Sequence, residues 1–288
     1  QPIDALDFAN PLENEIYEEM DPLLERIDDQ QRQLREQNKD LARAETMRRD
    51  FSSNVSHEMK TPLQVISGYA ELMRNDMVDP ADRQKFAGLI YDEAQSMRAL
   101  IDEVLTLSRL DETSFDGESA TLIDMLEVSK RVAGRLSSFA HDRGVSVEVS
   151  GDSACIAGSE TLVEEMLYNL VENGIRYNHE GGSVSVSVRL ELPTSAEQAD
   201  DIRALPAGER GRMRAVVRVS DTGPGIPEGK QEKIFERFYR LEKSRSKETG
   251  GTGLGLAIVK HAVMYHKGSV RVESEEGKGT VFILRIPT

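Results

Sequence analysis

Apolar residues recur every seven positions near the start of the chain, at Met20, Ile27, Leu34 and Leu41. Charged residues and glutamines occupy most positions between them. A seven-residue apolar repeat is the pattern of a coiled-coil seam, so it predicts a helix with one narrow apolar stripe. This helix is either part of an ordinary bundle or a dimeric signalling helix, and its length and polarity favour the second.

The apolar spacing then shifts, which is a stutter of the seven-residue repeat. A second apolar stripe, from Phe86 to about Leu110, follows a cap-plus-proline start at Asp79. The two stripes predict antiparallel helices joined near residues 75–80. Because two helices cannot cover both stripes, we expect a four-helix bundle built from two copies of the chain. The shifted positions of the first stripe are Met47, Phe51, Val55, Met59 and Leu63.

The pattern changes after a polar, glycine-containing segment at residues 111–119, which we interpret as a linker. Alternating apolar residues predict strands, and apolar residues at helical spacing predict helices between them. Such a mixture predicts an α+β two-layer sandwich. Residues 193–213 are polar and predict a loop. The predicted strands are 145–149, 183–192, 214–220, 269–273 and 280–286, and the predicted helices are 122–141, a segment after Ser159, and 254–265.

The length of the chain limits the number of domains, and its charge limits the classes of binding partner. A chain of 288 residues exceeds one compact domain and suggests two. With 36 basic and 51 acidic residues its net charge is −15, which disfavours binding to nucleic acid or anionic lipid. The single cysteine, Cys155, rules out an internal disulfide and indicates a reducing compartment. No transmembrane-length apolar run is present, but the chain opens at Gln1, so an upstream membrane anchor stays open.

A candidate nucleophile lies in the first long helix. His57 faces away from the apolar stripe, and the neighbouring Glu58 could take its proton. Thr61 lies one turn further along the same outer face. Pro62 lacks the N–H that would bond the carbonyl of Glu58, so we expect the helix to kink or loosen there. The alternative is a surface histidine without a task.

Two asparagines, Asn169 and Asn173, share one face of a predicted helix at i and i+4. Their amide oxygens suit a hard cation such as Mg²⁺ that bridges phosphates. Taken alone, they could equally be hydrogen-bonded polar residues at a domain boundary.

Two glycine-containing turns follow later in the chain. Asp221 ends a predicted strand and could accept a hydrogen bond from an exocyclic amine such as that of adenine, while Gly223 and Gly225 permit close backbone approach. Residues 250–255 are glycine-rich and open a helix, which suits an anion such as phosphate. Their spacing matches neither a P-loop nor a dinucleotide fingerprint. Each turn alone could be structural.

Between these turns, residues 226–249 form one of the few locally basic stretches, with Arg240 and Arg245 among its cations. We interpret it as a mobile lid that carries positive charge toward a phosphate. A solvated loop is the alternative.

In this order and spacing, the motifs resemble the histidine, asparagine, glycine and phenylalanine boxes of bacterial sensor histidine kinases, from about Arg48 to Thr288. The resemblance implies a dimerisation and phosphotransfer hairpin at residues 48–112, a linker at 113–120, and an ATP-binding domain at 121–288. That domain would have the two-layer sandwich of the gyrase, chaperone and histidine-kinase ATPases. Residues 1–47 resemble only a generic signalling coiled coil.

The resemblance also implies roles for individual residues. His57 would be the phosphoacceptor, Glu58 would orient or deprotonate it, and Thr61 would position a water during dephosphorylation of the partner. Asn169 and Asn173 would hold Mg²⁺. In the nucleotide site, Arg176 would contact phosphate, Tyr177 would lie near adenine, Asp221 would bind the adenine amine, Gly223 and Gly225 would shape the pocket, Arg240 and Arg245 would be lid cations, Gly251, Thr252, Gly253, Leu254 and Gly255 would form the phosphate-facing turn, and Thr280 would close the pocket floor.

The expected function is ATP-dependent autophosphorylation of His57 in a homodimer, then phosphoryl transfer to an aspartate on the receiver domain of a separate response regulator, with phosphatase activity toward that regulator as well. Expected cofactors are ATP and Mg²⁺, with no nucleic acid partner. The expected location is the cytoplasmic portion of an inner-membrane sensor. The alternatives are a response-regulator phosphatase or docking module with weak autokinase activity, and a plain ATPase, which leaves the His57 hairpin unexplained. Glu172, where the family often has aspartate, and the long 193–213 insert are departures that touch no motif.

Overall fold

A computed structural model describes residues 21–112, 121–192, 213–241 and 251–288. By contacts the chain divides into two units, residues 1–60 and residues 61–288. The predicted linker at 113–120, most of the 193–213 insert, and Arg245 lie outside the described residues.

The predicted long helix is present as α1, Asp21–Arg74, which begins at the cap-plus-proline position and spans 54 residues. We expected a kink or loosening at Pro62, but the α-helix continues on both sides of that residue. Leu34 and Leu41, two residues of the seven-residue repeat, are exposed within the single chain. No described helix is long and apolar enough to span a membrane.

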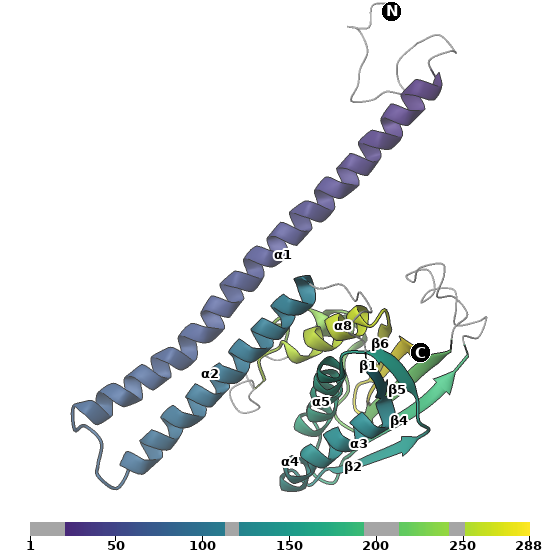
Figure 1. The fold of residues 1–288 in the computed structure, drawn as a ribbon. Coiled ribbons are helices and arrows are strands. Elements are labelled where there is room, and N and C mark those ends of the chain that lie inside the picture. Colours follow the sequence, from purple (N-terminus) through teal and green to yellow (C-terminus); the bar gives the residue numbers. More distant parts are fainter. Residues whose placement is uncertain (1–20, 113–120, 193–212, 242–250) are drawn as a thin grey trace, which may run out of the picture. The chain divides into compact units, whose positions relative to one another are not determined.

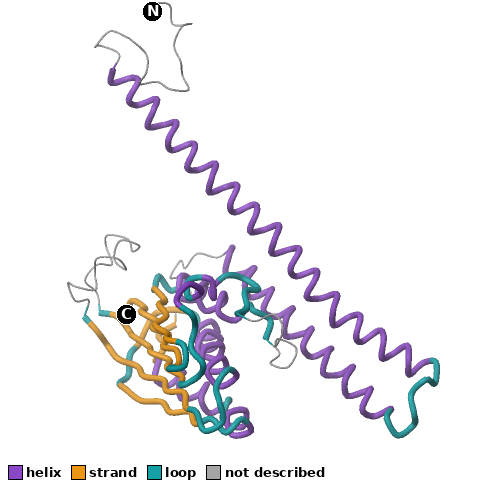
Figure 2. The backbone as a smooth tube through the Cα atoms, turned by 180° about the vertical axis from the view of Figure 1, so that it is seen from behind, coloured by secondary structure: helices purple, strands orange, loops and turns teal. Residues whose placement is uncertain are grey.

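A turn at residues 75–82 joins the end of α1 to α2, Arg83–Glu112, and the segment from Thr61 onward runs antiparallel to α2 (Figure 2). The rings of Tyr69 and Phe86 meet edge-on at 5.2 Å, one from each helix. Helix α2 begins three residues after the predicted proline start, because Asp79 instead closes a turn by accepting from the backbone N–H of Ala81 at 3.1 Å. The antiparallel hairpin is therefore as expected.

The remainder folds as an α/β layer pair (Figure 1). The predicted 122–141 helix is wrong in part, since that segment forms a short strand and two helices. Strand β3 was not predicted. The elements are β1 (Thr121–Asp124), α3 (Met125–Arg135), α4 (Ser137–Asp142), β2 (Ser146–Gly151), β3 (Cys155–Gly158), α5 (Glu160–Arg176), β4 (Ser183–Glu191), β5 (Arg214–Asp221), the 3₁₀ turns Glu228–Lys230 and Lys233–Phe235, α8 (Gly255–Tyr265), β6 (Ser269–Glu275) and β7 (Gly279–Pro287).

The main sheet has the order β2-β4-β5-β7-β6, in which only the β2–β4 pair is parallel. Strands β1 and β3 form a separate antiparallel pair. Alternate residues of the main strands point toward α3, α5 and α8, which cover one face, and bury an aliphatic core (Figure 1). This two-layer sandwich confirms the predicted fold class. Its inward-facing strand residues are Val184, Val186, Val188, Ala215, Val217, Val219, Phe282, Leu284 and Ile286.

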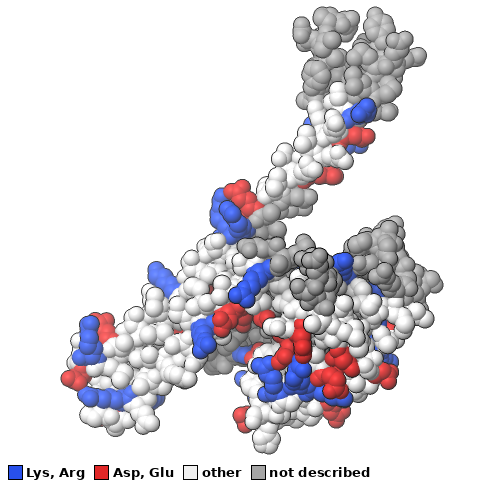
Figure 3. Space-filling view, viewed as in Figure 1, with Lys and Arg blue, Asp and Glu red and all other residues white. Residues whose placement is uncertain are grey.

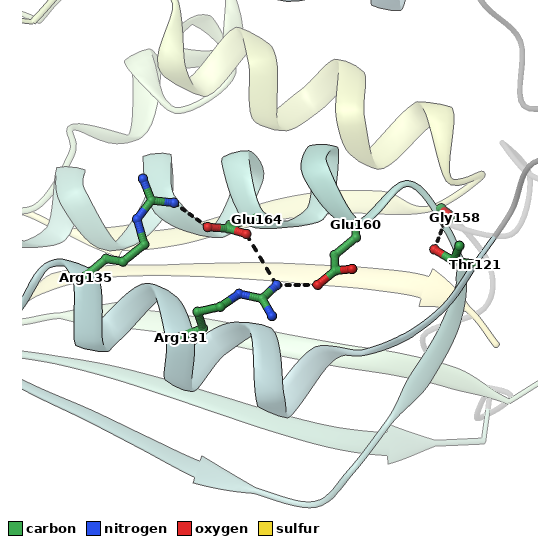
Figure 4. Close-up of polar contacts among 6 residues, drawn as sticks. All are labelled: Thr121, Arg131, Arg135, Gly158, Glu160 and Glu164. Atoms are coloured by element: carbon green, nitrogen blue, oxygen red, sulfur yellow. Dashed lines mark hydrogen bonds and ion pairs between the residues drawn. The ribbon is translucent and has the colours of Figure 1, made fainter.

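A charged network crosses from α3 to α5 (Figure 4). Arg131 contacts Glu160 at 2.6 Å and Glu164 at 3.3 Å, and Arg135 also pairs with Glu164. These side chains are largely exposed, so the ion pairs contribute little to the stability of the fold. On the face drawn in Figure 3, basic and acidic side chains are interspersed.

Candidate phosphoacceptor and nucleotide sites

The candidate nucleophile lies on α1 as predicted. His57 is exposed and Glu58 is half-buried. Thr61, also exposed, begins the second unit. An exposed imidazole can receive a phosphoryl group without any rearrangement of a core.

The asparagine pair lies on α5, with both side chains half-buried. The amide nitrogen of Asn169 donates to the carbonyl of Glu165 at 2.9 Å, so its Oδ1 stays available. That oxygen faces the start of α8, where a Cβ built on Gly255 would lie only 2.6 Å from it. The fold therefore brings together Asn169 and the glycine-rich turn, which are distant in sequence, and explains why glycine is needed at position 255.

Asp221 ends β5 beside Thr280 of β7, its strand partner. Its carboxylate accepts from the backbone N–H groups of Gly223, at 2.8 Å, and of Thr280. Burial raises the pKa of Asp221, and these two hydrogen bonds oppose the rise. Gly225 has φ 74°, and a Cβ there would overlap the carbonyl oxygen of Glu275 at 2.1 Å. Two predicted residues, Gly223 and Thr280, thus converge on the half-buried carboxylate of Asp221.

The glycine-rich turn leads into α8, and its backbone conformation favours glycine at one position. Gly253 has φ 76°, a conformation that favours glycine. Thr252 accepts from the backbone N–H of Leu254 at 3.2 Å, and Leu254 is fully buried at the helix N-terminus. The turn therefore presents backbone groups at the positive end of a helix, which suits an anion.

Four further residues were predicted for the nucleotide site, and the structure describes three of them. Arg176, which was predicted to contact a phosphate, forms an ion pair with Glu172 at 2.5 Å. Tyr177 is exposed, and its hydroxyl would lie 3.2 Å from a Cβ on Gly251. Arg240 is half-buried, and Arg245 falls outside the described residues.

Sequence reasoning missed two features of this region. Phe238 adopts φ 62°, which is strained for a bulky residue, and its N–H donates to the carbonyl of Gly253 at 2.9 Å. Glu103 of α2 accepts a hydrogen bond from the hydroxyl of Thr252. The second contact joins residues 149 positions apart, which no local pattern can reveal.

Known families match both parts of the chain. Residues 47–113 match the His Kinase A (phospho-acceptor) domain, and residues 158–288 match the histidine kinase-, DNA gyrase B- and HSP90-like ATPase family. The chain therefore belongs to the two-component sensor histidine kinases. This confirms the family that the motifs resemble.

Several relatives in that family align over most of the chain. The sensor-like histidine kinase SenX3 of Mycolicibacterium smegmatis is 36% identical over 250 residues, covering 85% of this chain and 59% of SenX3. The phosphate regulon sensor protein PhoR of Pseudomonas aeruginosa is 33% identical over 240 residues, covering 83% of this chain and 49% of PhoR. The chain thus spans only about half the length of these relatives.

Solved structures agree with the fold. Full-length ShkA in complex with AMPPNP superposes with a TM-score of 0.55 at 26% identity, over 82% of this chain and 45% of ShkA. The Acinetobacter baumannii histidine kinase AdeS gives a TM-score of 0.59 at 21% identity, over 80% of this chain and 97% of AdeS, which supports the fold alone.

Proposed function

We propose that the chain transfers the γ-phosphoryl group of ATP to His57 and then to an aspartate on the receiver domain of a separate response regulator. The observation that carries this proposal is the close approach of Asn169 to Gly255 at the N-terminus of α8. The proposal is supported by the match of another part of the same chain to a phosphoacceptor domain. The approach of Asn169 to Gly255 brings the amide oxygen of Asn169 close to a glycine-rich turn at a helix N-terminus, which suits an anion. ShkA, which shares the fold, was solved with a nucleotide analogue, and this supports the assignment.

In this reaction an imidazole nitrogen of His57 forms a bond to the γ-phosphorus while the bond to the bridging oxygen breaks and ADP leaves. Glu58, the adjacent residue, takes the ring proton. The half-buried carboxylate of Asp221 binds the exocyclic amine of adenine, and the N–H groups of the glycine-rich turn bind phosphate oxygens. Positioning and charge neutralisation supply most of the rate enhancement.

The amide oxygens of Asn169 and Asn173 fit Mg²⁺, since amide oxygens are hard ligands, and the lack of a side chain at Gly255 leaves room beside Asn169. Bound there with the nucleotide, Mg²⁺ would neutralise charge on the phosphate oxygens. Asn169 is preorganised for this role because its amide nitrogen is already bonded to the Glu165 carbonyl.

The family also suggests two partners for this chain, a receiver domain and a second copy of the chain. ThkA was solved in complex with a response regulator, TrrA, and we propose a receiver domain as partner here also. We propose a homodimer because apolar side chains of the hairpin are exposed in the single chain, at Leu63, Leu89, Tyr91, Ile101 and Leu105. The relatives named above are sensors, and we propose that this chain acts as the cytoplasmic portion of an inner-membrane sensor protein, which cell fractionation would test.

Labelling with γ-labelled ATP and Mg²⁺ tests the proposal. We expect acid-labile, base-stable label on the chain that disappears in His57→Gln, because no other group would replace the imidazole. His141→Gln, at an exposed histidine of α4, should keep the label. ATP turnover that survives His57→Gln without any labelled protein would instead indicate a plain ATPase.

We also propose phosphatase activity toward the phosphorylated receiver, supported by the exposed Thr61 in the family's Glu-x-x-Thr pattern. Thr61→Ala should slow dephosphorylation of the receiver by about tenfold or more while His57 still accepts label, since only the water-positioning hydroxyl is lost. The rate of label loss from the purified receiver measures this. Unchanged dephosphorylation in the variant would contradict it, and strong phosphatase activity with weak labelling of the wild type would favour the docking-module alternative.

A further inference from the structure

One face of α2 is buried although the helix lies outside the sandwich elements. Leu100, Leu107 and Leu110 are almost fully buried, and Glu103 and Thr106 between them are half-buried. These residues recur at helical spacing, so they share a side of α2. Ile101 and Leu105, on the other side, are exposed. We call the side made by Leu100, Glu103, Thr106, Leu107 and Leu110 the docking face.

Two polar contacts fix what covers this face. The hydroxyl of Thr252, in the glycine-rich turn, donates to Oε2 of Glu103. The hydroxyl of Thr106 donates to the carboxylate of Glu165 on α5. Both contacts join α2 to the same region of the sandwich, where the glycine-rich turn and the asparagine helix meet. The docking face is therefore matched to the proposed nucleotide site and not to an unrelated surface.

The Glu103 carboxyl occupies a position that suits a phosphate. Thr252, its donor, also accepts from the N–H of Leu254, the residue that caps the N-terminus of α8. An anion at that end of a helix is favourable. Nearby Glu165 and Glu172 carry like charge, while Arg176 is the cation that acts on Glu103. Burial is the largest cause of the rise in the pKa of Glu103 from 4.5 to about 7, and the like charges of Glu172 and Glu165 add to this rise.

We propose that the docking face is an autoinhibitory surface on which Glu103 takes the place of a nucleotide phosphate at Thr252, so that binding of a nucleoside triphosphate and docking of the glycine-rich turn on α2 exclude each other. The inference rests on the proposed nucleotide site. Because a triphosphate brings several negative charges to a turn that already contacts the Glu103 carboxyl, its binding separates Thr252 from Glu103. Nucleotide thereby releases the catalytic part from α2.

Calorimetric titration of the full chain with MgATP and with AMP tests this exclusion. Glu103→Ala should bind MgATP about fivefold more tightly than the wild type, because ATP no longer has to break a hydrogen bond to a carboxylate. AMP affinity should stay unchanged, since AMP lacks the terminal phosphates. Thr106→Val should shift MgATP affinity in the same direction by a smaller factor, because it removes the second contact without touching the nucleotide site.

Asp92→Ala is the matched control, since Asp92 is an exposed acid on the same helix. Equal MgATP affinity in Glu103→Ala, Asp92→Ala and the wild type would overturn the inference while leaving the proposed function intact. An equal gain for AMP and MgATP would also overturn it, because the terminal phosphates would then not be the competing group. A wild-type chain that binds no MgATP and takes no label would instead overturn the proposed function itself. Glu103→Leu, which has a similar volume and cannot accept a hydrogen bond, serves if Glu103→Ala does not fold.

Discussion

At the scale of single residues, some buried polar side chains connect neighbouring elements of the fold. His266 is one of them. It follows α8, is almost fully buried, and its Nε2 accepts from the N–H of Ser159 at 3.1 Å. Its Nδ1 bonds the carbonyl of Ala262 at 2.7 Å, so the ring is neutral with the proton on Nδ1. The close fit is visible at Gly158, where a Cβ would approach the ring at 2.2 Å.

Burial lowers the pKa of His266, although its bond to Ala262 opposes the change. Below the ordinary histidine pKa of 6.5, His266 becomes protonated in the unfolded chain but stays neutral in the folded chain until the pH is lower. The free energy of unfolding therefore falls as pH falls. Urea unfolding at about pH 5.5 and about pH 7.5 should show a loss of up to roughly 1 kcal/mol in acid that His266→Gln removes. His141→Gln should retain it, and an equal loss in both variants would contradict the assignment.

At the scale of elements, the position of α5 determines both candidate nucleotide centres, because it carries the asparagines and ends near Asp221. Two kinds of interaction hold it: the exposed network with Arg131 and Arg135, and a buried apolar face that includes Ile175. Their magnitudes differ. Exposed ion pairs contribute little, whereas removing a buried aliphatic side chain leaves a cavity.

Ile175→Ala should therefore lower the free energy of unfolding by about 2–5 kcal/mol, since the side chain is fully buried. Arg131→Ala should leave the denaturation midpoint almost unchanged. Chemical denaturation of the two variants beside the wild type compares them directly. A larger loss for Arg131→Ala than for Ile175→Ala would show that the charged network, and not the core, holds α5.

At the scale of the whole molecule, local sequence patterns predicted the elements that depend on residues close together in sequence. The start of α1, the hairpin, the main strands and the corner at Asp221 follow from apolar spacing, caps and turn residues. Strands β1 and β3 were missed because each is four residues long and pairs only with the other. The contact between Glu103 and Thr252 was missed for a different reason. Its two residues are far apart in sequence, and the spacing of apolar residues does not predict which distant polar side chains meet.

Strand order in the sheet has a consequence for how the protein is made. β7 is the last of the described strands in sequence, yet it lies between β5 and β6. Until its residues have left the ribosome, the backbone groups of β5 that pair with them have no partner and β6 has no neighbour in the sheet. The helical hairpin, encoded earlier, meets no such delay. The sheet of the sandwich can therefore be completed only after the residues of β7 have been translated, and folding of this part follows synthesis of its final strand.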